Sequence, residues 1–248
     1  MVLAMAKRRI QRLAEHMGYR VVPLVRDANT LRNWLFDQPI RTVIDVGAST
    51  GTTVIEWLDG FPSAEVHAVE PLPTSFAALG RLRERFPDRV HAYNFALGRK
   101  SGKVEFRLHP QHDTSSSLLA RTEYLARTQP LTRDEAVISV DMTTLDALFT
   151  DRSAELAPEI LLKLDVQGVE SDVIAGASKF LPQVKYFLTE ISLAPVYVGQ
   201  SDFNAVHSAL TAAGFELKGF LEQYHLPDRS PVYADVLYAN TALGSDGR

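Results

Sequence analysis

The stretch TVIDVGASTGTTVIEW, Thr42–Trp57, places a tight bend between an apolar strand and the start of a helix. The run RTVIDVG is rich in β-branched residues and predicts a buried strand, and TTVIEWLDG predicts a short helix that ends at Gly60. Gly47 and Gly51 bracket the bend. Residues without a Cβ let the backbone turn sharply and let a ligand approach the main chain. The bend therefore predicts a binding site on the backbone.

The composition is typical of a soluble globular protein with one large domain. The 248 residues are 46% hydrophobic and 23% charged, which is enough for a well-buried core. The net charge of −4 argues against a broad surface for nucleic acid or anionic membrane. The sequence has no cysteine, which excludes disulfides, a cysteine nucleophile and a thiolate metal site. This usage fits a reducing compartment, so we expect a cytoplasmic protein.

The first 40 residues predict an N-terminal helical extension that packs on the core. Their segment MVLAMAKRRIQRLAEHMGYRVV sets basic residues beside Ile10, Leu13 and Met17, the pattern of an amphipathic helix. A substrate lid or a membrane-surface contact is the alternative. The segment lacks the apolar stretch and cleavage site of a secretory signal, and no apolar run approaches the length of a membrane span.

Strand and helix patterns alternate across residues 41–248, apart from an insertion at about residues 100–145. AEVHAVEP, RVHAYNFAL, EILLKLDVQG and VKYFLTEIS predict strands, and TSFAALGRLRERFP, VESDVIAGASKFL and SDFNAVHSALTAAG predict helices. FELKGF and VYADVLYAN follow as two strands without a helix between them. This order predicts an α/β fold with a doubly wound, mostly parallel sheet of about seven strands, one of them antiparallel.

The insertion does not continue the alternation of strands and helices. GKVEFRLHP and AVISVDM predict strands of alternating character around the polar segment QHDTSSSLLARTEYLARTQPLTRDE. We expect a β-hairpin with a long loop, followed by a short helix at TTLDALF. His109 and His112 become candidate bases if this loop folds over the site.

The bend GASTG lies at the carboxyl edge of the predicted sheet, where ligands of doubly wound folds bind. Dinucleotide enzymes use G-x-G-x-x-G there, but Ser49 stands at the second glycine position. The pattern is D-x-G-x-x-x-G, with Asp45 two residues before Gly47. A carboxylate at the loop favours a cofactor with cationic groups over a pyrophosphate. The pattern resembles motif I of class I S-adenosylmethionine-dependent methyltransferases.

The ends of the next two strands predict further contacts to a nucleoside. Glu70 and Pro71 come about twenty residues after the loop, where a carboxylate accepts the ribose hydroxyls of NAD and of S-adenosylmethionine alike. Asn94, Ala96 and Leu97 are expected beside the adenine. The full predicted cofactor set is Asp45, Gly47, Ala48, Ser49, Gly51, Glu70, Pro71, Asn94, Ala96, Leu97 and Asp165.

The chain resembles the FkbM-type family of class I S-adenosylmethionine-dependent methyltransferases. The resemblance rests on VIDVGASTG, VEP, NFALG, VDMTTLDAL, LLKLDVQGVESDVIAGA and TEISLAPVYVGQSDF. The strongest of these segments resembles the family's K-I-D-V-E-G-x-E, with Gln167 where glutamate is usual. The resemblance implies O-methylation of a hydroxyl on a small molecule, sugar, glycolipid or polyketide.

Carboxylates at the fourth and fifth predicted strands are candidates for the proton acceptor that an alcohol needs during methyl transfer. Asp165 and Glu190 lead, and Lys163 shares a strand face with Asp165, where it can pair with a carboxylate or orient the acceptor. Weaker acceptor-side candidates are Gln167, Glu170, His112 and Tyr197. We predict no metal, because the carboxylates give no defensible octahedral set and Gln167 adds no charge.

Three alternative functions share parts of this pattern. A nicotinamide-dependent oxidoreductase would use the same loop and Glu70, but the three-glycine fingerprint is missing. An RNA 2′-O-methyltransferase would use Lys163, Asp165, Lys185 and Glu190, although Lys185 begins its strand and the chain is acidic. The third is a catalytically inactive S-adenosylmethionine-binding protein. The sequence leaves the acceptor molecule and the oligomeric state open.

Overall fold

The computed structural model describes residues 30–150 and 155–244. The chain divides into two compact units, one that ends at Leu35 and one that runs from Phe36 onward. The amphipathic helix predicted near the N-terminus lies outside the described residues, and the first described element is the short helix α2, Leu31–Phe36. None of the helices in the described part of the chain combines the length and the apolar character that crossing a bilayer requires.

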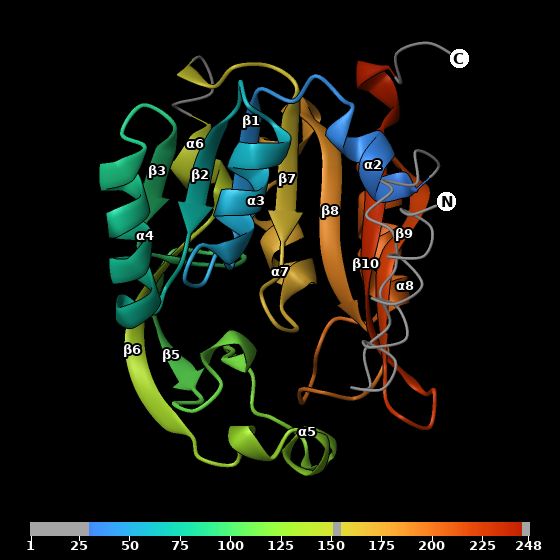
Figure 1. Cartoon of the computed structure of the whole chain (residues 1–248). Helices are drawn as coiled ribbons and strands as arrows, with labels where there is room; N and C mark the ends of the chain where they lie inside the picture. Colours follow the sequence, from blue (N-terminus) through green and yellow to red (C-terminus); the bar gives the residue numbers. More distant parts are fainter. Residues whose placement is uncertain (1–29, 151–154, 245–248) are drawn as a thin grey trace, which may run out of the picture. The chain divides into compact units, whose positions relative to one another are not determined.

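A seven-stranded sheet forms the centre of the larger unit, in the order β3-β2-β1-β7-β8-β10-β9 (Figure 1). The five parallel strands are β3 (Val90–Tyr93), β2 (Glu65–Val69), β1 (Thr42–Val46), β7 (Ile160–Leu164) and β8 (Val184–Ser192). Strand β10 (Pro231–Asn240) pairs antiparallel with both β8 and β9 (Phe215–His225). The predicted doubly wound sheet with one antiparallel strand is confirmed.

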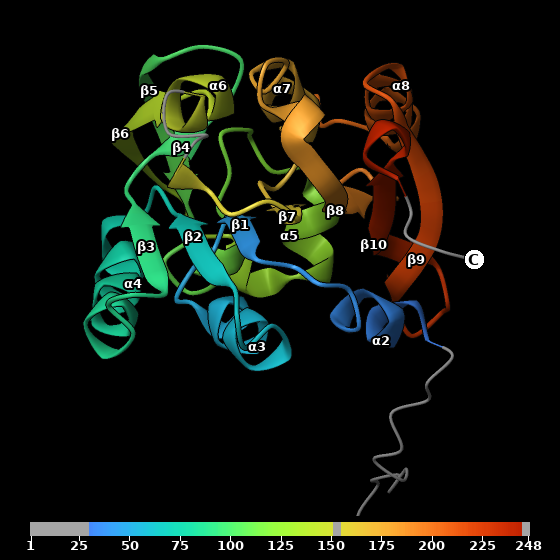
Figure 2. The ribbon, with the colours of Figure 1, turned by 90° about the horizontal axis from the view of Figure 1, so that it is seen from above.

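Helices cover both faces of this sheet (Figure 2). On one face lie α3 (Thr52–Gly60) and α4 (Pro73–Arg85), and on the other lie α6 (Leu145–Phe149), α7 (Glu170–Ala175) and α8 (Phe203–Ala212). Because both faces are covered, every residue of β1 and β7 is buried, as the apolar runs of these strands predict. Four buried phenylalanines, Phe149, Phe180, Phe187 and Phe215, belong to the core cluster.

The strand order reverses between β1 and β7. The chain moves outward from β1 through β2 to β3 and returns on the other side of β1 as β7. The parallel register pairs Val46 with Leu164, and the Asp165 N–H donates to the Val46 carbonyl at 3.0 Å. The bend after β1 and the residues after β7 therefore share one edge, which is the usual ligand position in such sheets.

A second, three-stranded sheet lies beyond this edge (Figure 1). Strands β5 (Gly102–Leu108) and β6 (Ala136–Thr143) are antiparallel, and β4 (Ala96–Leu97) pairs with β6 in parallel. Helix α5 (Glu123–Thr128) belongs to the connection between β5 and β6, and its Leu125 packs in a cluster with Val196 and Tyr197. The insertion thus forms a cover over the carboxyl ends of the central strands.

The segment RVHAYNFAL is not one strand, contrary to the prediction. Strand β3 ends at Tyr93, and Ala96–Leu97 belong to the second sheet. Between them, the Asn94 side chain donates to the carbonyls of Glu70 and Pro71 at 2.8 and 3.0 Å. These bonds hold the chain at the end of β2 and separate β3 from β4.

The helix predicted over VESDVIAGASKFL is also shorter than expected, because α7 ends at Ala175. The Asp146 carboxylate accepts the N–H groups of Lys179 and Phe180, which replaces helical hydrogen bonding in that segment. A Cβ on Gly176 would lie 2.2 Å from the Gly98 carbonyl oxygen. Tertiary contacts therefore end this helix, and local propensity does not reveal them.

Candidate functional site

The loop after β1 is shaped by left-handed backbone. Gly47 and Gly51 have φ angles of +80° and +91°, and Ser49 between them has φ of 46°. A Cβ on Gly47 would lie 1.9 Å from the carbonyl oxygen of Asp165. Even the smallest side chain is excluded there, so glycine is required where the ends of β1 and β7 meet.

Glu70 holds this loop from the end of β2. Its Oε2 accepts the Ser49 N–H at 2.9 Å, and its Oε1 accepts the Leu72 N–H at 2.8 Å. The side chain is buried, and burial raises its pKa to about 7. Each carboxylate oxygen keeps a further lone pair, so Glu70 can still accept hydrogen bonds from a ligand.

A cavity of about 200 Å³ opens in front of the loop. Its wall combines the loop, the ends of β2 and β7 and part of the insertion. The predicted cofactor residues on this wall are Gly47, Ala48, Ser49, Glu70, Pro71, Ala96, Leu97 and Asp165. Three predicted residues, Asp45, Gly51 and Asn94, do not line it.

The same wall holds residues that the sequence pattern did not indicate. They come from the β3–β4 turn and from the insertion, and they include Phe95, Phe106, Asp113, Thr114, Ser116 and Leu118. The alternation in GKVEFRLHP predicts one inward face for β5, on which Phe106 lies, but nothing in the local sequence shows that this face meets the loop.

Asp45 lies behind the cavity wall. It is fully buried, with Oδ1 3.2 Å from the Lys163 ammonium, and its Oδ2 accepts the Trp57 Nε1–H at 3.1 Å. Burial lowers the pKa of Lys163, but the charges of Asp45 and Asp165 outweigh this effect and raise it above its ordinary value. The direct attraction between Asp45 and a cofactor, expected from the sequence, is thus replaced by an indirect effect: Asp45 neutralises Lys163, which lines the cavity.

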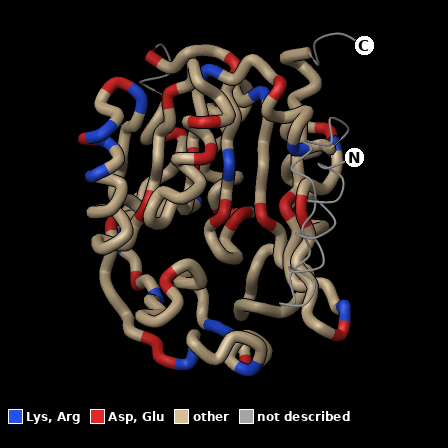
Figure 3. Tube along the Cα trace, in the orientation of Figure 1, with Lys and Arg blue, Asp and Glu red and all other residues tan. Residues whose placement is uncertain are grey.

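Carboxylates dominate the charge on the cavity wall. Glu70, Asp113 and Asp165 line it, against the single ammonium of Lys163, which Asp45 balances. Figure 3 shows acidic positions where the central strands end. Such a wall favours cationic groups and repels a pyrophosphate.

A second cavity, of about 170 Å³, adjoins the first. Asp165, Gln167 and Thr114 line both cavities. The predicted acceptor-side residues Glu190, His112 and Tyr197 line the second one. No sequence pattern indicates its other residues, which are Ser115, Leu125, Gln129, Ser192, Val196, Val232 and Tyr233.

Gln167 links the polar groups between the cavities. Its Nε2 donates to Asp165 Oδ1 at 2.6 Å and to Glu190 Oε1 at 3.3 Å, and its Oε1 lies 2.7 Å from the Tyr197 hydroxyl. The backbone at Gln167 is left-handed, with φ of 57°, and so is Gly168 after it. The amide donor offsets the repulsion between two carboxylates that face the same space.

The acceptor-side groups have shifted proton affinities. Burial, and then the charges of Asp165 and Asp235, raise the pKa of Glu190 well above its ordinary value. Burial also raises the pKa of Tyr197, so its hydroxyl stays protonated. A carboxylate with a raised pKa is a stronger base when ionised, which suits it to accept a proton from a ligand hydroxyl.

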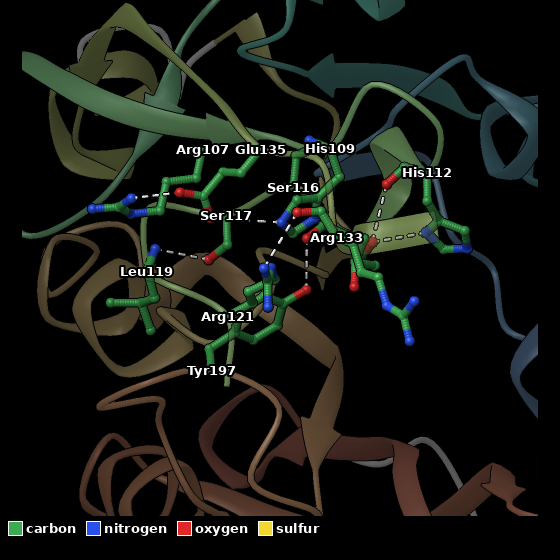
Figure 4. Close-up of polar contacts among 12 residues, drawn as sticks. Arg107, His109, His112, Ser116, Ser117, Leu119, Arg121, Arg133, Glu135 and Tyr197 are labelled. Atoms are coloured by element: carbon green, nitrogen blue, oxygen red, sulfur yellow. Dashed lines mark hydrogen bonds and ion pairs between the residues drawn. The ribbon is translucent and has the colours of Figure 1, made fainter. Parts of the chain in front are cut away.

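The serine-rich turn of the insertion is tied to both β5 and the second cavity (Figure 4). Ser117 exchanges backbone hydrogen bonds with Arg107 at 2.8 and 3.0 Å, and its hydroxyl donates to the Gln167 carbonyl at 2.6 Å. The Tyr197 hydroxyl lies 2.8 Å from the Ser115 carbonyl oxygen. These bonds make the turn a fixed part of the wall that both cavities share.

Two other predicted candidates, Glu170 and His109, line neither cavity. The Glu170 carboxylate is buried at the start of α7 and accepts the Gly168 N–H at 3.0 Å, and burial raises its pKa to about 7. Burial lowers the pKa of His109, whose ring lies 3.8 Å from Glu135. Neither side chain has a position from which to contact an acceptor in the second cavity.

Lys185 lies at the opposite edge of the sheet. It is the second residue of β8, and its ammonium pairs with Glu159. Glu190 comes five residues later, at about 3.3 Å of strand rise per residue. The four residues that an RNA 2′-O-methyltransferase would require are therefore not assembled.

The chain belongs to the methyltransferase FkbM domain family, which matches residues 45–217. The 2-O-methyltransferase NoeI of Sinorhizobium fredii is 30% identical over 219 residues, which cover 84% of this chain and 83% of NoeI. The hexuronic acid methyltransferase AglP of Haloferax volcanii is 26% identical over 147 residues, 59% of this chain and 54% of AglP. The solved structure of methyltransferase FkbM from Methylobacillus flagellatus KT has a TM-score of 0.50 and 15% identity. It covers 81% of this chain, which spans 44% of that longer chain.

Membership of this family makes the protein a class I methyltransferase, and its cofactor is S-adenosyl-L-methionine. The residues present fit this cofactor. The glycine loop leaves room for a ligand against the backbone, Glu70 stands at the end of β2, and the carboxylate-rich wall suits a ligand with an ammonium and a sulfonium.

We expect Gly47→Ala to reduce the affinity for S-adenosylhomocysteine at least tenfold, because the added methyl group forces the loop away from Asp165. Isothermal titration calorimetry measures the affinity. Gly80→Ala in α4 is the matched control, since a Cβ there meets nothing within 4 Å. Unchanged binding by Gly47→Ala would show that the loop does not form the cofactor site.

We expect Glu170→Gln to stabilise the protein at pH 8 by about 3 kcal/mol, and by much less near pH 4.5. The pKa of Glu170 is about 7 in the folded state against 4.5 in the reference state. The free energy of unfolding therefore falls as the pH rises from 4.5 to 7, and glutamine removes this loss. Urea unfolding at both pH values measures the effect. The exposed Glu105→Gln is the control, and an equal pH dependence in Glu170→Gln and the parent would contradict the expectation.

Proposed function

We propose that the protein transfers a methyl group from S-adenosylmethionine to a hydroxyl of a sugar or another polyhydroxylated small molecule. The observation that carries this proposal is that Asp165 and Gln167 line both cavities. A donor in one cavity and an acceptor in the other would meet at these two residues. The names of two relatives, a 2-O-methyltransferase and a hexuronic acid methyltransferase, support a hydroxylated acceptor.

In this proposal the first cavity holds the cofactor. The backbone from Gly47 to Ser49 and the Glu70 carboxylate contact its polar groups, and Phe95, Leu97 and other apolar wall residues surround its base. S-adenosylmethionine supplies a methyl group on a positively charged sulfur. Asp165 and the neighbouring carboxylates favour that charge.

The second cavity suits a sugar because its wall is mostly polar and includes an aromatic ring. Tyr233 lines it and stacks on Tyr224, with 5.0 Å between the ring centroids. Gln129 also lines it, and its buried Oε1 accepts no hydrogen bond from the residues that the structure describes. A ligand hydroxyl can donate a hydrogen bond to this buried oxygen, which otherwise needs a donor from water.

We assign the proton acceptor to Glu190. As the acceptor oxygen forms its bond to the methyl carbon, the hydroxyl proton passes to the Glu190 carboxylate and the carbon–sulfur bond breaks. Gln167 orients this carboxylate, while the Lys163 ammonium lies 3.5 Å from the Asp165 carboxylate. The mechanism uses no metal at this site, because the Gln167 amide already supplies the donor between the two carboxylates.

Incubation with methyl-labelled S-adenosylmethionine and a panel of glycosides tests the function. We expect label to enter at least one glycoside, and the same glycoside with its reactive hydroxyl replaced by hydrogen to stay unlabelled. NAD should not compete with the labelled cofactor. Cofactor binding without transfer to any hydroxylated acceptor would favour the catalytically inactive alternative, and binding of NAD in its place would favour an oxidoreductase.

We expect Glu190→Gln to lower kcat at least 100-fold and to leave the affinity for S-adenosylhomocysteine unchanged, because Glu190 lines only the acceptor cavity. In the parent enzyme, kcat should rise with pH as the Glu190 carboxyl ionises, since its pKa is raised. Asp165→Asn is the comparison. If Glu190→Gln keeps the parent's rate and pH profile while Asp165→Asn is inactive, Asp165 is the base and our assignment is wrong.

A further inference from the structure

A second cluster of potential ligands lies at the edge of the sheet opposite the methyl-transfer site. It consists of Glu65 and His67 on β2 and His91 on β3. We propose that these three side chains bind one divalent transition-metal ion, with zinc as the expected ion. The proposal is independent of the methyl acceptor, because the cluster shares no residue with either cavity.

The strand geometry brings the three side chains to one face. Glu65 and His67 are two residues apart on β2 and so point to the same side of the sheet. His67 is in register with His91 on the neighbouring parallel strand, which puts His91 on that side as well. This arrangement follows from the backbone and does not depend on a flexible loop.

The distances suit a site that closes around an ion. The candidate ligand atoms all lie within 4.8 Å of one another, and His91 Nε2 is 3.1 Å from Glu65 Oε2. Ligand atoms around tetrahedral zinc are about 3.4 Å apart, given bonds of about 2.1 Å. The side chains of Glu65 and His91 are 48% and 37% exposed, so both are free to make the remaining movement of about 1 Å.

His67 is the fixed member of the cluster. It is buried, its Nδ1 lies 3.0 Å from the Tyr93 hydroxyl, and the Phe149 ring packs edge-on against it. A histidine that binds a metal through one ring nitrogen commonly uses the other nitrogen for a hydrogen bond that orients the ring. Tyr93 supplies this partner and leaves Nε2 as the nitrogen for the ion.

The two imidazole rings set one geometric requirement. They stack with 4.7 Å between centroids and 25° between planes, so their nitrogen lone pairs run nearly side by side. Both can reach one ion only if a ring turns. The partly exposed His91 is the ring that turns, because His67 is held by its neighbours.

The ligand types point to zinc. Imidazole nitrogen suits zinc, copper and nickel better than magnesium or calcium, and a carboxylate is an ordinary third ligand of zinc. Three protein ligands at a partly exposed position leave a fourth place for water. The ion would join β2 to β3, which is the edge strand of the sheet. We infer a structural role, because the ion would hold two neighbouring strands together. One of them, β2, begins at Glu65 and is followed directly by Glu70.

The sequence predicts no metal, and that prediction concerned the carboxylates near Asp165. No sequence pattern indicates the histidines as metal ligands. His67 and His91 are 24 positions apart, and neither AEVHAVEP nor RVHAYNFAL has a known metal-ligand spacing. Only the pairing of β2 with β3 brings them together.

Calorimetric titration of the chelator-treated full chain with zinc chloride tests the proposal. We expect one saturable site, a thermal midpoint raised by zinc, and an affinity at least tenfold weaker in both His91→Ala and Glu65→Ala. These ligands are partly exposed, so the variants should fold, and thermal melts in chelator check this. His225→Ala, at an exposed position on β9, is the matched control and should bind zinc as the parent does.

Cobalt absorption gives a second readout, since a tetrahedral site with nitrogen ligands has visible bands that the His91→Ala variant should lose. Absence of saturable zinc binding would overturn the proposal. Undiminished affinity in His91→Ala and Glu65→Ala, or loss of binding in His225→Ala, would also overturn it. Methyl transfer is measured separately and has no bearing on these outcomes.

Discussion

The close contact between Gly47 and the Asp165 carbonyl is the constraint on which the site depends. The strand order reverses between β1 and β7, so the two strand ends lie side by side with no room for a side chain. The glycine loop leaves from one end, and Asp165 and Gln167 leave from the other. This close backbone approach places the glycine loop of the first cavity next to Asp165 and Gln167, which line both cavities.

Charged side chains near the ends of β1 and β7 are arranged in pairs. The buried Asp45 balances Lys163 from behind the wall, so the net charge that a ligand meets is negative. On the acceptor side, the Gln167 amide stands between Asp165 and Glu190 and lets two carboxylates share one space. A buried charge partner and an amide donor therefore allow these acidic side chains to lie close together.

The insertion completes both cavities, and this part of the site was least visible in the sequence. Phe106 comes from a predicted strand of the insertion, and Asp113 and Gln129 come from its polar segment, for which the pattern predicts only a loop. Their positions depend on long-range contacts, such as the bond from Ser117 to the Gln167 carbonyl. Local patterns do not encode contacts between segments fifty residues apart, so no reading of the insertion alone places these residues.

The sequence by itself determined the sheet, the glycine loop and the positions of Glu70 and Asp165, because strand and helix periods and the need for a residue without a Cβ are local properties. Tertiary structure alone decided that Asp45 pairs with Lys163 behind the cavity wall, that Glu170 lines neither cavity, and that His67 meets His91. The physical reason is that burial and strand pairing fix which side chains share a space, and both arise only when distant segments pack together.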